Sequence, residues 1–159
     1  MNIFYLSHCP EYAAKLQCDK HVVKMILETA QMLSTAHHEL GSDYSEVVYK
    51  STHKNHPSAV WLRSNTENYT WAYQHFMALC REYTHRYGKT HLSETKLAKI
   101  LCHYPDDLPY GTFTFPPKCM PDDYKDSSKS PINSYQAYYR ATKRSFAKYT
   151  NRACPGFMT

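Results

Sequence analysis

The sequence predicts a mainly α protein: a single compact helical domain over residues 1–159, with a short N-terminal extended segment and a long Pro-rich loop before the last helix. Three observations predict this fold. Apolar residues recur at helical spacing over residues 19–41. Gly41 and Gly88 follow two long periodic segments, where helices commonly stop. The length of 159 residues suits one domain with a buried core.

The first elements follow from local signals. Residues 2–6 are apolar and β-leaning, which predicts either one strand or an anchored terminus. Pro10 suits the first turn of a helix that runs to about Gln17. Asp19 is a suitable N-cap for a long helix that ends at Gly41.

The middle of the chain reads as further helices. Pro57 can open a helical segment that continues over residues 58–87, with a possible break at residues 64–65. A shorter helix fits residues 94–102, with Ser93 as its cap.

A proline-rich connection precedes the last helix. Residues 104–131 form a long irregular loop of the kind that is usually functional or mobile. Pro131 then starts a helix that runs to about Tyr149.

Composition favours an anionic partner. The net charge is +5 with ten further histidines, and fifteen tyrosines offer flat faces for base stacking. We therefore expect DNA or a nucleotide as the partner. No apolar run is long enough for a membrane span, and the N-terminus lacks a secretory pattern, so we expect no membrane contact and a cytoplasmic location, that of the host cell if the protein is viral. Six widely spaced cysteines without a CxxC pair predict free thiols.

A polar stripe lies along the predicted helix over residues 19–41. From His21 its members recur every three or four residues and so share one face, namely His21, Lys24, Glu28 and Gln31, and Lys20 directly precedes them. One interpretation is a solvated face with an ordinary Lys24–Glu28 pair. The other is the wall of a cleft, because the apolar arc is broad enough to bury most of the helix. A partly buried carboxylate beside an amine and an imidazole suits acid–base chemistry.

The start of the next helix forms a second constellation. His56 directly precedes a helix N-terminus, where backbone N–H groups favour an anion. His53 and Lys54 add donors, and Arg63 lies two turns further on. These residues predict either a phosphate pocket or a capping loop with incidental histidines. No metal-ligand motif is present, so we expect neither a metal nor a cofactor.

The last predicted helix is basic and aromatic. Arg140, Lys143 and Arg144 interleave with tyrosine and phenylalanine, which suits phosphate contacts and base packing. The alternative is a helix with one face of packed aromatic side chains and an opposite, solvated basic face. That alternative does not explain why the charged residues are all positive.

Three segments carry a resemblance to known proteins: CDKHVVKMILETAQMLSTAHH, THKNHPSAVWLRSNTENYTWAY and RYGK. They resemble an uncharacterised family from bacteriophages and other DNA viruses. The order of elements is also similar to that of the pyrimidine-dimer DNA glycosylases of endonuclease V type. The shared features are an extended start, KNHP leading into a helix with an arginine, and an aromatic, basic C-terminal helix.

The resemblance implies an all-helical DNA-repair glycosylase and lyase. Such enzymes use a free amine as nucleophile at the sugar carbon, with a glutamate beside it, and cleave the strand by elimination from an imine. Glu28 is the candidate carboxylate, and Met1, Lys20 or Lys24 supplies the amine, with His21 nearby. Asn2 is bulky, so we expect Met1 to be retained, whereas this class usually exposes a small N-terminal residue.

Two other functions fit the same residues. The first is a non-catalytic viral protein that binds nucleotides or nucleic acid, such as a nucleotide sponge. The second is a histidine-dependent or metal-dependent phosphodiesterase.

Overall fold

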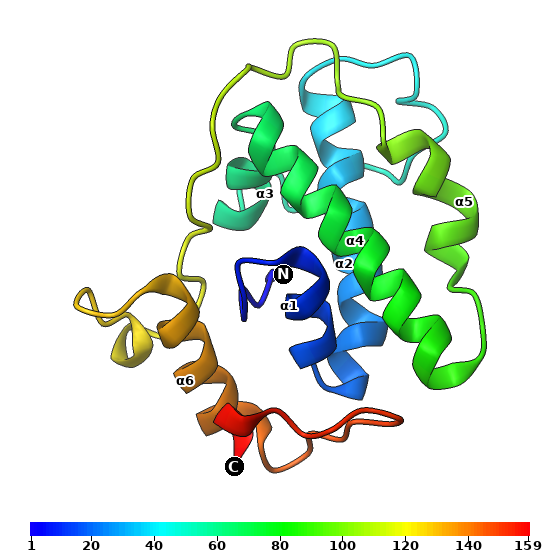
Figure 1. Cartoon of the computed structure of the whole chain (residues 1–159). Helices are drawn as coiled ribbons and strands as arrows, with labels where there is room; N and C mark the ends of the chain where they lie inside the picture. Colours follow the sequence, from blue (N-terminus) through cyan, green and yellow to red (C-terminus); the bar gives the residue numbers. More distant parts are fainter.

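The computed structural model describes all residues 1–159 and is all-helical (Figure 1). The prediction of a mainly α fold is therefore confirmed, and no strand forms. None of the helices is both long and apolar enough to cross a membrane. The elements in chain order are α1 (Pro10–Leu16), α2 (Asp19–Glu39), α3 (Pro57–Leu62), α4 (Thr66–Tyr87), α5 (Leu92–Leu101), the 3₁₀ turn η1 (Asp122–Tyr124), α6 (Pro131–Lys143) and the 3₁₀ turn η2 (Gly156–Met158).

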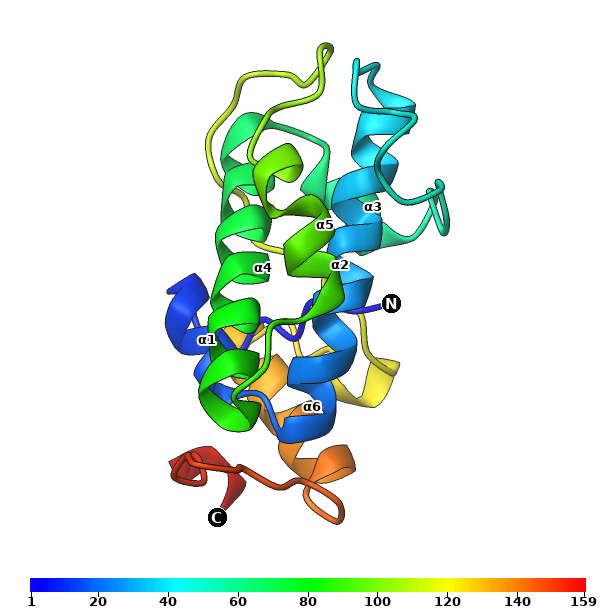
Figure 2. The same cartoon turned by 90° about the vertical axis from the view of Figure 1, so that its right-hand side faces the viewer.

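Two long helices organise the molecule. α2 packs against α4, and α3 and α5 also pack against α2, while α1 lies along α4 (Figures 1 and 2). α6 lies at the end of the molecule away from α5, and the proline-rich connection runs past α3 to reach it (Figure 1). One continuous apolar core joins these parts. Its largest fully buried side chains include four tyrosines, Tyr5, Tyr69, Tyr135 and Tyr139.

The N-terminal segment is an anchored terminus rather than a strand. Residues 2–6 are all buried, and Tyr5 and Leu6 have no exposed surface. Gln17 donates from Nε2 to the carbonyl of Ile3 at 3.3 Å, and Gln136 donates to the carbonyl of Leu6 at 3.0 Å. Side chains rather than a neighbouring strand therefore satisfy this backbone.

Three predicted helix boundaries are wrong, and specific contacts in the structure explain each. Asp19 is the first residue of α2, not its N-cap, because its carboxylate binds Thr150 and Arg86 instead. α5 is capped by His91, whose Nδ1 accepts from the Ser93 N–H at 3.1 Å. The last helix ends at Lys143, since the chain beyond it turns back to cover the start of α2.

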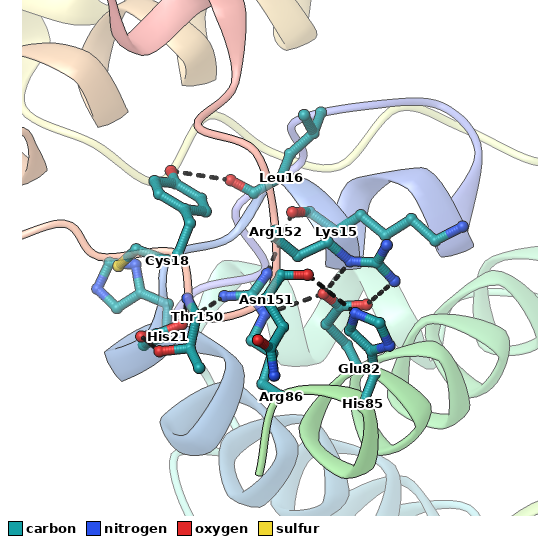
Figure 3. A network of polar contacts seen from close by, with 12 residues as sticks. Lys15, Leu16, Cys18, His21, Glu82, His85, Arg86, Thr150, Asn151 and Arg152 are labelled. Atoms are coloured by element: carbon teal, nitrogen blue, oxygen red, sulfur yellow. Dashed lines mark hydrogen bonds and ion pairs between the residues drawn. The ribbon is translucent and has the colours of Figure 1, made fainter.

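A buried ionic network ties the C-terminal segment to the helices (Figure 3). Arg86 has no exposed side-chain surface and donates to Glu82 and to Asp19, each at 2.9 Å. Arg152 binds both carboxylate oxygens of Glu82, at 2.7 and 3.0 Å. Asp19 also accepts from the backbone N–H and the hydroxyl of Thr150. α2, α4 and the C-terminal segment therefore share one network of charges.

The network shifts both carboxyl groups in the same direction. Burial alone would raise the pKa of Asp19, but hydrogen bonds from Thr150 and Arg86 hold it below its ordinary value. Burial opposes the change at Glu82 as well, and hydrogen bonds from Arg152 and Arg86 lower its pKa. Each group thus stabilises the folded state in its charged form.

We expect Glu82→Gln to lower the free energy of unfolding by about 3 kcal/mol, because it leaves the buried Arg86 guanidinium undercompensated. Urea denaturation at pH 7 measures this change. Glu11→Gln is the matched control, since Glu11 pairs with Lys15 on the surface at 3.8 Å and its loss should cost less than about 0.5 kcal/mol. Equal unfolding midpoints for the two variants would contradict the role of the network.

The lowered pKa values of Asp19 and Glu82 also predict that the folded state loses stability in acid. A carboxyl whose folded-state pKa is depressed stabilises the protein above its unfolded pKa, about 4 for these types, and loses that contribution as the pH falls through the folded value. The unfolding midpoint should therefore decline as the pH is lowered from about 5 to 3. The decline should be shallower in Glu82→Gln than in Glu11→Gln, and equal slopes would show that other groups cause it.

Candidate active site

The buried N-terminal segment brings the chain terminus to the middle of α2. The α-ammonium nitrogen of Met1 lies 3.9 Å from Oε2 of Glu28, and Nζ of Lys24 lies 3.4 Å from Oε1 of the same carboxylate. The Glu28 side chain is 13% exposed, whereas that of Lys24 is 65% exposed. Two amines therefore flank one half-buried carboxylate, one from within the protein and one from its surface.

The Glu28 carboxylate is incompletely satisfied. Its Oε2 atom is buried and accepts no hydrogen bond within the chain. Buried carboxylate oxygens are normally hydrogen-bonded, and an unpaired one carries a free-energy cost. An oxygen of this kind is free to accept a proton or to face a developing positive charge.

A cavity of about 500 Å³ opens beside the N-terminus. Met1 forms one part of its wall, and α3 contributes His56 and Pro57. The proline-rich connection supplies the rest of the lining: Pro117, Lys118, Cys119, Met120 and Lys125. The cavity thus combines an amine, an imidazole and two lysines with apolar side chains, and it is large enough for a small organic group.

His56 is held as a neutral ring. It is the N-cap of α3, and its Nδ1 accepts from the backbone N–H of Ser58 at 3.1 Å, which leaves the proton on Nε2. Burial is the main cause that lowers its pKa, and the positive N-terminus and His53 act in the same direction, against the opposing effect of Glu28. His56 therefore lies near both the N-terminus and the Glu28 carboxylate, although Glu28 does not line the cavity.

His21 occupies the core rather than an open cleft wall. Its ring stacks on Phe4 with centroids 4.4 Å apart, and its Nδ1 shares a hydrogen bond of 2.7 Å with the hydroxyl of Tyr139. The same hydroxyl accepts from the backbone N–H of Cys18 at 2.9 Å. Burial, aided by the charges of Lys143 and Lys24, lowers the pKa of His21 to about 4. The ring is therefore neutral at pH 7 and holds Phe4 in place.

Basic side chains continue outward from this point. Lys143 lies over the rings of Phe4 and Tyr138, at 5.9 and 5.1 Å from their centroids. Lys20 lies 5.0 Å from the ring centroid of Phe146. Since Lys24 also lies near Glu28, three lysines from α2 and α6 share the surface around the buried His21 ring.

The remaining candidates are more scattered. Lys54 is exposed and pairs with Glu39 at 3.6 Å, and His53 is exposed and contacts only its neighbour Thr52 through Nδ1 at 2.7 Å. Arg63 is half-buried, with one terminal nitrogen that has no partner. None of these three lines the cavity at Met1, and nor do Gln31, Arg140 and Arg144. Arg140 lies on a separate pocket of α6, and Arg144 is exposed.

Sequence reasoning missed the wall formed by residues 117–125. These residues come from the proline-rich loop, whose length alone indicated a functional role. Which of its side chains reach the N-terminus depends on the path of the loop across the molecule (Figure 1). No group of three or more histidine, cysteine, aspartate or glutamate side chains is arranged to hold a metal ion, and all six cysteines are free.

Comparison with known proteins gives one match. The family model described as pyrimidine dimer DNA glycosylase matches residues 1–95, which include Met1, Glu28 and His56. Neither a curated protein nor a solved structure matches the chain. The matched stretch covers more than half of the 159 residues, and the chain therefore belongs to the pyrimidine dimer DNA glycosylase family.

Proposed function

We propose that this protein excises pyrimidine dimers from DNA with the α-amino group of Met1 as nucleophile and Glu28 as its carboxylate partner. One observation carries the proposal: the terminal amine lies 3.9 Å from a buried carboxylate oxygen that has no other partner. The family membership supplies the reaction class, and the adjacent cavity supplies space for a nucleotide fragment.

The geometry favours Met1 over the lysines as the nucleophile. Lys24 is 65% exposed, Lys20 lies over the Phe146 ring, and neither lysine lines the cavity at Met1. Met1 itself lines the cavity, where a sugar carbon can approach its nitrogen.

The proposed reaction proceeds in two stages. The lone pair of the Met1 amine forms a bond to C1′ of the damaged nucleotide, and the glycosidic electron pair leaves with the base, which takes one of the two protons from the attacking nitrogen. The C1′–O4′ bond then breaks, O4′ keeps its electron pair and takes the second proton as a hydroxyl, and an imine forms between Met1 and C1′. A base then removes a C2′ proton, and the 3′ phosphate leaves as the strand breaks.

Glu28 is suited to both stages. While the glycosidic bond breaks, positive charge develops at the sugar, and a fixed carboxylate nearby stabilises it. In the second stage the unpaired oxygen can accept the C2′ proton. The neutral His56 ring, with its proton on Nε2, lines the cavity at Met1, which Glu28 does not line, and is a donor there for the sugar or a phosphate.

The surrounding lysines are suited to hold the DNA backbone. Lys24, Lys143 and Lys20 lie near Glu28, Phe4 and Phe146, and cations that contact phosphates supply much of the affinity of proteins for DNA. In this proposal Arg140 and Arg144 of α6 extend the same basic surface.

Glu28→Gln should abolish most turnover without loss of binding. On a duplex that contains one cyclobutane pyrimidine dimer, we expect the single-turnover cleavage rate to fall by about 100-fold or more, since a positioned acid–base group typically contributes that much. The dissociation constant for the duplex, measured by fluorescence anisotropy, should change less than about threefold. Glu39→Gln on the same helix is the control and should retain the wild-type rate. A variant that cleaves normally would remove Glu28 from the mechanism.

Trapping with borohydride identifies the amine. Wild-type protein on abasic-site DNA should form a covalent adduct, and mass spectrometry of its peptides should place the adduct on Met1. An extension of Gly-Ser before Met1 should remove the adduct, because the nucleophile moves out of the site, whereas Lys24→Ala and Lys20→Ala should keep it. An adduct on either lysine would contradict the assignment, and binding without any adduct or cleavage would point to a protein that only binds DNA.

A further inference from the structure

We infer that Asn2 is a positioning residue that holds the Met1 amine in line with Glu28; this inference rests on the proposed function. The Asn2 side chain is buried and makes hydrogen bonds in two directions. Its Oδ1 accepts from the backbone N–H groups of Ile3 and Phe4, at 2.8 and 2.9 Å. Its Nδ2 donates to the carbonyl of Cys119 at 2.7 Å.

The first of these contacts folds the terminus back on itself. Phe4 has φ of +53°, a left-handed conformation that is rare and strained for a bulky residue. It is stabilised by Asn2 Oδ1, by stacking of its ring on His21, and by the N–H of Leu6, which donates to the Phe4 carbonyl at 2.8 Å. Strain that persists because several contacts hold it is characteristic of functional sites.

The second contact ties the terminus to the cavity wall. The Cys119 carbonyl is a firm anchor because the hydroxyl of Tyr135 accepts from the Cys119 N–H at 3.1 Å and donates to the Pro117 carbonyl at 2.6 Å. Nζ of Lys118 also binds two loop carbonyls, those of Asp126 and Lys129. Asn2 therefore connects the residue that carries the amine to a wall fixed by α6.

Together the two contacts leave Met1 little freedom. The residue next to the amine is fixed to its own backbone on one side and to the wall on the other, so the amine faces Glu28 before any substrate binds. Rates depend steeply on this kind of preorganisation, and a displacement of about 1 Å can cost about 100-fold. Asn2 touches neither a cofactor nor the Glu28 carboxylate, so its effect passes through Met1.

Asn2→Asp tests the donor with almost no change in size. The variant keeps one oxygen for the Ile3 and Phe4 amides but places a second oxygen against the Cys119 carbonyl, which removes the tie to the wall and adds repulsion. Aspartate is as bulky as asparagine, so Met1 should remain, and intact mass checks this. Asn133→Asp is the matched control, since it makes the same charge change on an exposed residue of α6.

Two measurements read the position of the amine. The first is the single-turnover rate of borohydride trapping on abasic-site duplex DNA, together with the dissociation constant for that duplex. The second is the rate at which an N-hydroxysuccinimide acetate acylates the Met1 amine at pH 7, followed by mass spectrometry without DNA. We expect Asn2→Asp to trap at least tenfold more slowly with affinity within threefold, and its amine to acylate at least threefold faster.

A second variant, Asn2→Gln, keeps the inference testable if Asn2→Asp does not fold. Its side chain keeps the carbonyl and the NH₂ of the amide but places them one methylene further from the backbone, and Met1 should remain. Trapping should again fall by about tenfold at an unchanged melting temperature. Wild-type rates of trapping and acylation in folded Asn2 variants would overturn the inference. If wild-type protein forms no adduct, the proposed function fails, and the acylation rates still decide whether Asn2 fixes the amine.

Discussion

Burial of the N-terminal segment is the constraint on which the rest of the structure depends. Residues 2–6 lie inside the molecule, where every backbone group needs a partner. Gln17 on the α1–α2 connection and Gln136 on α6 satisfy carbonyls of this segment. The buried His75 ring fixes Gln17 in turn: its Nδ1–H donates to the Pro10 carbonyl at 3.0 Å, so its Nε2 accepts from Gln17 at 3.2 Å. Burial lowers the pKa of His75 to about 4, which keeps this ring neutral.

This constraint explains how the terminal amine comes to lie beside a carboxylate. Chain termini are usually mobile unless they are tied down. Here the terminal amine directly precedes the buried residues 2–6, and it lies beside the Glu28 carboxylate of α2. An amine on a lysine would reach the same place only with several free torsions, whose ordering has an entropic cost. A buried terminus offers a nucleophile with fewer torsions to restrain.

The sequence predicted the helices well where the signal came from residues close together in the chain. Helical periodicity and glycine stops located α2 and α4 closely, and the proline at 131 marked the start of α6. The i,i+4 spacing of Lys24 and Glu28 also predicted their ion pair. The end of α6 and the true role of Asp19 depend on contacts more than 100 residues apart in the chain, such as that between Asp19 and Thr150. No local signal carries such information.

The same limit applies to the candidate site. Glu28 and Met1 were predicted from residue type and resemblance, but their separation of 27 positions gives no distance, and only the fold brings them to 3.9 Å. His21 read as part of a polar face because of its spacing, yet Phe4 and Tyr139 bury it. The wall at residues 117–120 was not predicted, because its approach to Met1 requires Tyr135 and Asn2 to fix the loop.

These contacts show that the two parts of the chain contribute differently to the candidate site. The stretch matched by the family model carries the amine, the carboxylate and the capping histidine. The remaining stretch supplies Tyr139 for His21, Gln136 for Leu6 and the Cys119 carbonyl for Asn2. Each of these three contacts ends on the N-terminal segment or on the ring that supports it. The candidate site residues therefore lie in the first part of the chain, and contacts from the second part help to fix their relative position.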